Sequence, residues 1–271
     1  MSMKIPSILF AKTTLVGGWL AVLFIVERVF PMARMGDPDP GEPTGKGYRL
    51  GRNLGLWMIN LILSPVIIVP LTALAANHAV QWRPALAPWW QGGEGLLLDL
   101  LILDLFIYGW HRANHRMPFL WRFHQVHHRD RFLDVTSSVR FHFGEVMLSA
   151  LVRGGFIFVM GIPLRSVAVF EILLLMAAAF HHSNIRLPPK LEKFLAKLIV
   201  TPSIHWVHHH RIRQDTDSNY ATILSGWDIL FASRSETKRT TTMPIGVEGE
   251  PELPLKELLV LPMHNKKSRL G

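Results

Sequence analysis

The chain has 271 residues, of which 49% are hydrophobic and 18% are charged, and this balance is typical of a membrane protein. It contains no cysteine, which excludes disulfides, cysteine-bound zinc, iron–sulfur clusters and thiol nucleophiles. The formal net charge is +9, but the basic residues flank apolar segments rather than forming one stripe interleaved with aromatic residues, so we expect no nucleic-acid partner.

Residues 1–95 contain two apolar segments that we expect to anchor the chain in a membrane. Residues 13–26 form the first segment, and no small-residue cleavage site follows it, so the pattern favours an anchor helix over a signal peptide. Residues 54–76 carry no charge and exceed the ~20 residues that cross a bilayer. Pro65 and Pro70 predict kinks within this second helix.

Three shorter apolar runs follow, and they determine where the histidines can meet. Residues 96–110 form a third span, which Asp99 and Asp104 interrupt. Residues 146–160 and 166–180 are separated by a Gly-Ile-Pro turn, which predicts a hairpin that returns the chain to the side it left. Histidine clusters flank this hairpin, so they can meet on one side. We predict an all-α membrane bundle of about four to five membrane helices in two hairpins, with a histidine-rich helical cap.

Loop charge predicts the orientation of this bundle. Residues 31–53 and 111–131 contain several arginines, whereas residues 77–95 carry Arg83 as their only Lys or Arg. Basic loops remain in the cytoplasm, so we expect the cap on the cytoplasmic face and the N-terminus outside. The membrane would be a bacterial inner membrane or the endoplasmic reticulum.

The histidines carry the strongest functional signal. The chain has 14 of them, and most fall in HRANH (111–115), HQVHH (124–128) and HWVHH (205–209). Positions i, i+3 and i+4 share a helix face, so each HxxHH triplet can direct three imidazoles at one spot. One metal takes ~4–6 ligands, so a larger set favours two metals. The predicted ligands are His111, His115, His124, His127, His128, His182, His205, His208 and His209.

The remaining histidines are expected to have other roles. His78, His142 and His264 are isolated in the sequence, and we interpret them as structural or incidental. His181 and His210 adjoin predicted ligands but point to another helix face, so we expect supporting or surface roles for them.

Several metal chemistries compete for this pattern. The zinc-protease signature HExxH is absent. A haem would take one histidine from each of two helices, which leaves the triplets unexplained. Imidazole binds zinc as well as iron, so a non-catalytic zinc carrier or store remains an alternative to a redox enzyme.

Carboxylates near these histidines are candidates to orient them. An Asp one or two turns before a ligand can accept its second ring N–H, and Asp104 lies on one helix face with His111 and His115. Glu145, Asp217 and Asp228 are further candidates of this kind. Arg153 and Glu171 fall within the apolar hairpin, where charges need partners, so we expect them to pair.

In these residues the chain resembles the fatty acid hydroxylase superfamily, also called the sterol desaturase family. The resemblance covers about residues 96–232 and rests on an ordered set of motifs: DLFIYGWHRANH (104–115), LWRFHQVHH (120–128), RFHFGE (140–145), HSNI (182–185), TPSIHWVHHHR (201–211), NY (219–220) and WDILF (227–231). Three features depart from the family pattern. Ala221 and Ala232 stand where glycines are usual, and His210 is an additional histidine.

The resemblance implies a four-helix membrane body, a cytoplasmic cap and a histidine-bound di-iron centre. Zinc can replace iron during expression, so the purified protein could contain zinc. It also implies O₂ as co-substrate for hydroxylation or desaturation of a lipid C–H bond. The sequence lacks the HPGG stretch of cytochrome b5 and the GxGxxG of a dinucleotide site, so we expect electrons from a separate cytochrome b5-like or ferredoxin/reductase donor.

Three regions are therefore predicted. Residues 1–95 form the anchoring helices, residues 96–232 the catalytic domain and residues 233–271 a polar tail or cap element. Within this last region, the LPLKELLVL segment (253–261) predicts a short amphipathic element that packs on the body.

Overall fold

The computed structural model describes residues 5–35, 45–80, 90 and 92–264. Within these ranges the chain is helical, and it contains isolated β-bridges but no strand. The prediction of an all-α fold is therefore confirmed for the described part of the chain.

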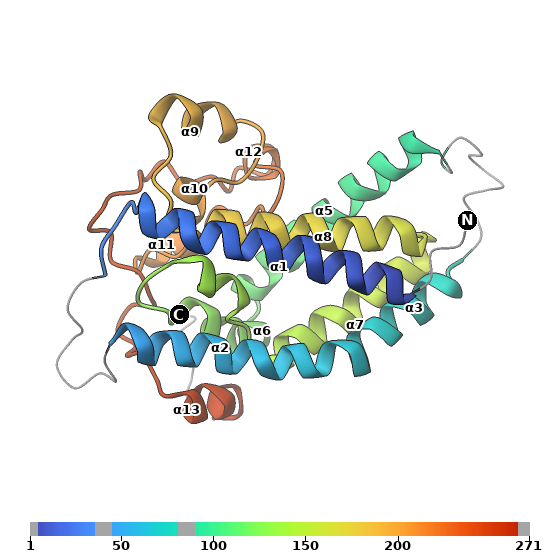
Figure 1. Cartoon of the computed structure of the whole chain (residues 1–271), viewed down its shortest axis with the longest axis horizontal. Helices are drawn as coiled ribbons and strands as arrows, with labels where there is room; N and C mark the ends of the chain where they lie inside the picture. The colour runs from blue at the N-terminus through green and yellow to red at the C-terminus, as the bar shows by residue number, and fades with distance from the viewer. Residues whose placement is uncertain (1–4, 36–44, 81–89, 91, 265–271) are drawn as a thin grey trace.

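Long apolar helices form the body of the molecule. They are α1 (Ile5–Val29), α2 (Lys46–Leu63) continued by η1 (Ser64–Ile68) and α3 (Val69–Asn77), α7 (Phe143–Met160) and α8 (Leu164–His182). Four stretches within them are long and apolar enough to cross a membrane: Phe10–Val29, Lys46–Asn77, Phe143–Met160 and Leu164–His182. These helices run alongside one another, with α1 packed on α8 and α3 on α7 (Figure 1).

The predicted distortion around Pro65 is present as a π-helical turn. Residues Ser64–Ile68 form this turn between α2 and α3, with the proline in its first positions. Proline has no N–H to donate to the preceding turn, and a single π turn absorbs that missing bond while the helix continues. The two helices therefore form one long span of 32 residues.

The predicted α7–α8 hairpin is also present. Gly161 caps α7 with a φ of 66°, a left-handed conformation that glycine adopts at little cost. Across the hairpin, Arg153 contacts Glu171 at 3.1 Å, which confirms the expected pair. Lys12 of α1 also contacts Glu171, at 2.7 Å, so one carboxylate joins three helices among apolar surroundings.

Helix α5 (Gly93–Arg116) includes the predicted third span and continues beyond it to carry His111 and His115. Leu97, Leu101 and Leu105 lie at i, i+4 and i+8 and are 63%, 42% and 38% exposed, so α5 presents an apolar stripe outward. The stretch is not among the four candidate spans.

Shorter helices gather at one end of the body and form the cap (Figure 1). They are α6 (Pro118–His128), η3 (Val135–Val139), α9 (Pro189–Leu195), α10 (Pro202–His208), α11 (Arg213–Thr216), α12 (Gly226–Leu230), α13 (Leu255–Val260) and η4 (Leu261–Met263). The expected amphipathic element is α13, and its Leu258 is buried against Leu56 and Val126.

Buried ion pairs fasten the cap to the body and to the C-terminal region. Arg49 of α2 donates to Asp130 at 2.6 Å and to Asp134 at 2.7 Å. Arg140 donates to Glu252 at 2.8 Å, and both side chains are buried. Residues beyond 233 thus contribute to the interior, while the boundaries between the three predicted regions remain predictions.

Candidate metal centre

The cap brings all nine predicted histidine ligands together in two groups. The five-histidine group consists of His111, His115, His124, His128 and His208, and the four-histidine group of His127, His182, His205 and His209. Within each group one nitrogen of every ring lies within 4.8 Å of the others. Two nitrogens on opposite sides of one metal ion are about 4.2 Å apart, so each group has nearly the dimensions of a metal site.

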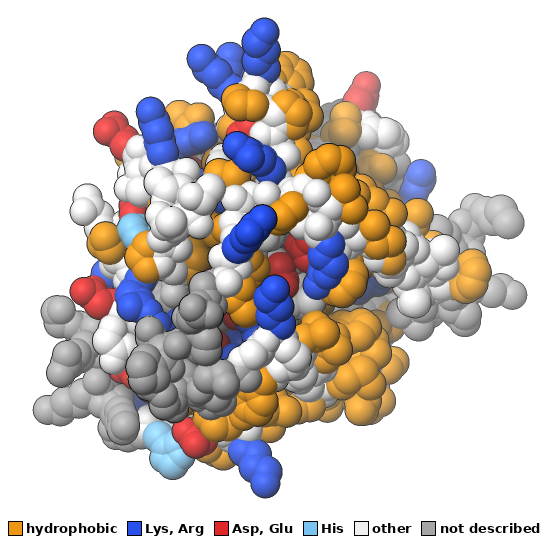
Figure 2. All heavy atoms as spheres, turned by 60° about the vertical axis from the view of Figure 1, so that its left-hand side comes forward, with side chains coloured by type: hydrophobic (Ala, Val, Ile, Leu, Met, Phe, Trp, Pro, Cys, Tyr) orange, Lys and Arg blue, Asp and Glu red, His pale blue; other side chains and the backbone are white. Residues whose placement is uncertain are grey.

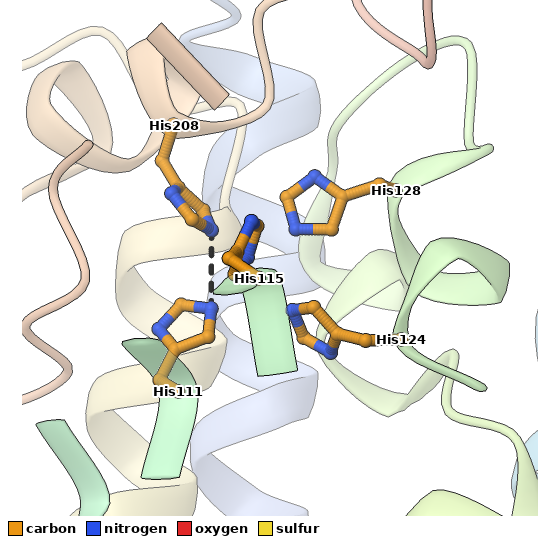
Figure 3. A group of neighbouring side chains, drawn as sticks. All are labelled: His111, His115, His124, His128 and His208. Atoms are coloured by element: carbon orange, nitrogen blue, oxygen red, sulfur yellow. Dashed lines mark hydrogen bonds between the residues drawn. The ribbon is translucent and has the colours of Figure 1, made fainter. Parts of the chain in front are cut away.

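Three segments of the chain supply the five-histidine group, and their rings converge on a common space (Figure 3). His111 and His115 project from successive turns of α5, His124 and His128 from α6, and His208 from the end of α10. Pro118 begins α6 directly after α5 and fixes the short connection that turns one helix toward the other.

Each HxxHH triplet divides between the two groups, which corrects the expectation that a triplet converges on one spot. His124 and His128 join one group while His127 joins the other, and His205 and His209 likewise separate from His208. Residues i and i+4 are stacked along a helix, whereas i+3 is displaced around it, so a helix between two sites serves both. The described residues therefore form two candidate metal sites.

The four-histidine group is closely packed. Nε2 of His182 lies 3.0 Å from Nε2 of His127 and 3.0 Å from Nε2 of His205. Nε2 of His209 lies 3.1 Å from that of His205. The two groups adjoin, because the rings of His128 and His209 stack with their centroids 4.2 Å apart.

Backbone carbonyls determine which nitrogen of several rings carries a proton. The Nδ1 atoms of His111, His127, His182 and His208 lie 2.6–3.1 Å from carbonyl oxygens: those of Tyr220, Arg140, Ala178 and Ser218. A carbonyl can only accept, so each Nδ1 must donate. In the neutral ring, Nε2 then holds a lone pair and is available as a metal ligand.

These lone pairs face one another. Nε2 of His127 lies 3.0 Å from Nε2 of His182, and Nε2 of His208 lies 3.1 Å from Nε2 of His111. Two acceptors at this distance form no hydrogen bond unless one of them is protonated. A cation placed between the rings would satisfy both lone pairs, so the residues of both groups fit a metal.

Burial makes the protonated alternative unfavourable. Loss of solvent, followed by the charge of neighbouring imidazoles, lowers the pKa of His111 to about 3. The same causes lower the pKa well below its usual value for His115, His127, His128, His205, His208 and His209. Neutral imidazole is the form that binds metals.

Unsatisfied ring nitrogens lead to the same conclusion. Five histidines have a buried nitrogen without a hydrogen-bond partner among the described residues: His115, His124, His128, His205 and His209. Each unsatisfied polar atom costs about 1–3 kcal/mol. One per residue would cost about 5–15 kcal/mol, which is comparable to the whole stability of a typical domain. A metal bound by Nε2 of His124 and by one nitrogen each of His115 and His128 would remove part of this cost. In His205 and His209 the unpaired atom is Nδ1, across the ring from the Nε2 atoms that face their neighbours.

The predicted carboxylates differ in what they contact. Glu145 accepts from Nδ1 of His124 at 2.7 Å, in the orienting position that was expected. Asp217 lies 3.7 Å from Nδ1 of His115, which is too long for a hydrogen bond.

Asp104 does not contact a histidine in the described structure. It accepts from the indole N–H of Trp227 at 2.8 Å and from the backbone N–H of Leu224 at 3.1 Å, so it tethers the chain after α10 to α5. Asp228 has a similar backbone role, because it accepts the N–H groups of Tyr220 and Ala221.

The histidines outside the predicted ligand set have other contacts. His142 caps α7 by accepting from the N–H of Gly144, and His264 is exposed. His210 is buried, not superficial, and its Nδ1 lies 2.7 Å from Asp215. His181 is also buried, and its ring centroid lies 3.9 Å from that of His205. It therefore packs against the four-histidine group.

Two aromatic residues beside the five-histidine group were not anticipated from the sequence. The ring centroids of Trp121 and Tyr220 lie 5.1 and 5.3 Å from that of His115. Tyr220 lies in the NY motif, and Trp121 is three residues before His124, so a helical-face plot of α6 would have placed Trp121 near the ligands.

The membrane-length helices define an integral membrane protein. The two adjoining imidazole groups at one end of these helices define a centre that is competent to bind metal. Residues 96–233, about half of the chain, match the sequence profile of the family described as fatty acid hydroxylase. The chain belongs to this fatty acid hydroxylase family.

Individual relatives are lipid enzymes by name. The chain is 26% identical to ornithine lipid hydroxylase OlsE of Rhizobium tropici over 242 residues, which are 85% of this chain and 69% of that protein. It is 31% identical to alkylglycerol monooxygenase of Danio rerio over 54% of this chain, and it spans only 30% of that relative. A very-long-chain aldehyde decarbonylase of Oryza sativa is 24% identical over 67% of this chain and 29% of the relative. No solved structure gives a significant match.

Proposed function

We propose that this protein is an O₂-dependent hydroxylase or desaturase that acts on a C–H bond of a membrane lipid. Its two histidine groups would hold two iron ions. The observation that carries the proposal is the pair of adjoining imidazole groups, whose lone pairs face one another at the end of a membrane bundle. The named relatives, a lipid hydroxylase and an alkylglycerol monooxygenase, support the reaction type and a lipid substrate.

The chemistry requires a redox-active group. A lipid C–H bond does not react with acids, bases or ordinary nucleophiles, so iron would supply the electron transfer and O₂ activation that no side chain provides. Zinc would bind the same imidazoles but has no redox chemistry.

The protein's own residues prepare the site. Burial keeps the imidazoles neutral and excludes water, which protects reactive species from side reactions. Backbone carbonyls fix four ring tautomers, and Glu145 fixes His124 as a fifth by holding its Nδ1 proton. These contacts orient the rings before any metal binds.

The lipid would approach along α5. His111 is the only partly exposed member of the five-histidine group, and the others are buried. The same helix, α5, has the exposed leucine stripe of Leu97, Leu101 and Leu105, which runs along the helix toward the end that holds His111. An amphiphile could keep its tail against this stripe while a carbon near its polar end reaches the metals.

The basic loops support a cytoplasmic location for the cap, in a bacterial inner membrane or the endoplasmic reticulum. A separate cytochrome b5-like or ferredoxin/reductase protein would deliver electrons there.

Metal exchange tests the proposed function. Purified protein would be depleted of metal, reloaded with ferrous iron or with zinc, reduced and exposed to O₂ with membrane lipid. For the iron-loaded protein we expect about two irons per chain, O₂ uptake and a lipid product that is heavier by one oxygen or lighter by two hydrogens. The zinc-loaded protein should show neither O₂ uptake nor product. Stable zinc binding without O₂ uptake after iron loading would overturn the proposal in favour of a non-catalytic zinc carrier or store.

A further inference from the structure

Helix α9 presents an unusual surface for a soluble cap. Leu191, Phe194 and Leu198, in and just after the helix, are 43%, 59% and 55% exposed. Between them lie the exposed side chains of Lys190, Lys193 and Lys197. Apolar residues that alternate with lysines and remain in solvent are typical of a helix lying in the plane of a membrane surface.

Helix α12 extends this apolar surface. The N–H of Ser225, just before α12, donates to the carbonyl of Leu198 at 3.2 Å, so the end of the α9 segment adjoins the start of α12. Exposed apolar side chains continue there: Ile229, Leu230 and Phe231 are 61%, 67% and 41% exposed. We define the α9–α12 surface as Leu191, Phe194, Leu198, Ile229, Leu230 and Phe231, together with Lys190, Lys193 and Lys197.

The fold places this surface level with the ends of the membrane spans. Span α8 ends at His182, and α9 begins at Pro189, after a short connection. Phe231 stacks on Tyr108 of α5 with ring centroids 5.1 Å apart. Tyr108 lies about one helical turn beyond Leu105, the last residue of the leucine stripe. In the view of Figure 1, α9 and α12 do not extend past the cap end of α1 along the long axis of the molecule.

The charge of the surface selects its partner. Residues 186–198 contain one arginine and three lysines but only one acidic residue. That residue, Glu192, turns inward and accepts from the hydroxyl of Ser203. At the height of α9, Figure 2 shows basic side chains beside hydrophobic ones. A basic and apolar surface at a bilayer edge complements anionic lipid headgroups above an apolar interior.

We propose that the α9–α12 surface rests on the same bilayer that the long helices span. Its apolar side chains would enter the boundary between headgroups and acyl chains. The lysines would contact anionic phospholipid headgroups.

Site-specific fluorescence tests the proposal, because the chain has no cysteine and a single introduced thiol can be labelled uniquely. Full-length Phe194→Cys and Leu230→Cys proteins would carry an environment-sensitive dye. They would be reconstituted in phosphatidylcholine vesicles with or without about 30% phosphatidylglycerol, with a shallow nitroxide-labelled lipid as quencher. Ile25→Cys, exposed on α1 near the cap end of a candidate span, and Glu248→Cys, on the exposed loop before α13, are the quenched and unquenched controls.

We expect Phe194→Cys and Leu230→Cys to be quenched as strongly as Ile25→Cys in the mixed vesicles and less in phosphatidylcholine alone. Replacing Lys190, Lys193 and Lys197 by Glu should reduce quenching in mixed vesicles to the phosphatidylcholine level, whereas replacing them by Arg should preserve it. Quenching no greater than at Glu248→Cys would overturn membrane contact. A blue-shifted but unquenched dye would indicate a protein partner or second copy instead, and equal quenching in both vesicles would overturn the role of anionic headgroups.

Discussion

The two histidine groups adjoin through the stacked rings of His128 and His209, but they differ in their surroundings. The five-histidine group has one partly exposed ligand, a carboxylate bonded to His124, and the aromatic rings of Trp121 and Tyr220 alongside. The four-histidine group is fully buried, and its Nε2 atoms follow one another at 3.0–3.1 Å. In the described structure no carboxylate hydrogen-bonds to its rings. We expect lipid to reach the five-histidine group, while the other holds its metal in a closed cage.

Removing a ligand from either group should have the largest effect. Each of His127→Ala and His208→Ala deletes one imidazole from a different group, so each should abolish lipid oxidation and lower metal content, as measured by elemental analysis and product formation. His264→Ala is the matched control, because this residue is exposed and belongs to neither group. Equal losses in all three variants would contradict the ligand assignment.

Glu145→Gln should separate the two groups. The neutral amide holds the Nδ1 proton of His124 less strongly than the carboxylate, and loss of such a contact typically costs about 10–100-fold in metal affinity or activity. Metal titration should show one weakened site and one unchanged site. Asp217→Asn should have a smaller effect, since Asp217 is 3.7 Å from His115. Weakening of both sites by Glu145→Gln would contradict separate groups.

Acid should destabilise the metal-free protein. Burial lowers the pKa of His111 from its ordinary value of 6.5 to about 3 in the folded state. Between these values the unfolded chain binds more protons, so stability is present above pH 6.5 and is lost as the pH falls toward 3. The thermal unfolding midpoint in detergent should therefore fall with pH across this window. Bound metal should delay the loss, and an acid-insensitive midpoint would contradict the burial of neutral rings.

The smallest expected effect concerns two alanines outside both groups. Ala232 has a φ of 50°, whereas Ala221 does not have a positive φ. Glycine removes the steric cost of the left-handed conformation, so Ala232→Gly should raise the free energy of unfolding by about 1 kcal/mol. Ala221→Gly should lower it by about 1–2 kcal/mol, because Ala221 is buried, so the change removes a buried methyl group and also adds backbone freedom to the unfolded chain. Denaturant titration would measure the free energy of unfolding of both variants. A decrease for Ala232→Gly would contradict backbone strain at Ala232, and an increase for Ala221→Gly would contradict the expected loss at Ala221.

The sequence predicts the long helices and the ligand set better than it predicts how ligands divide. Apolar length indicates the α7–α8 hairpin, and helical spacing selects eight of the nine histidines that the fold gathers. The ninth, His182, is added from the HHSN sequence that follows the hairpin. The assignment of His127 and His208 to opposite groups depends on how α6 and α10 rotate against each other, which is a property of tertiary packing.

Other parts of the centre leave no side-chain signal. The acceptors that fix the tautomers are backbone carbonyls, such as those of Ser218 and Tyr220, and any residue type supplies a carbonyl. Asp104 has the correct helical spacing to reach His111, but the indole of Trp227, more than a hundred residues later, occupies its carboxylate. Spacing within one helix cannot reveal a competitor from another.

The pairing of Arg140 with Glu252 has a consequence for biosynthesis. Arg140 provides the carbonyl that fixes the ring of His127, and its guanidinium is buried against Glu252. During translation, every histidine ligand leaves the ribosome before Glu252 does. The histidine cage would therefore reach its final rigidity only after the segment around Glu252 has been synthesised and has packed against Arg140, so that stable metal binding would follow the synthesis of this segment.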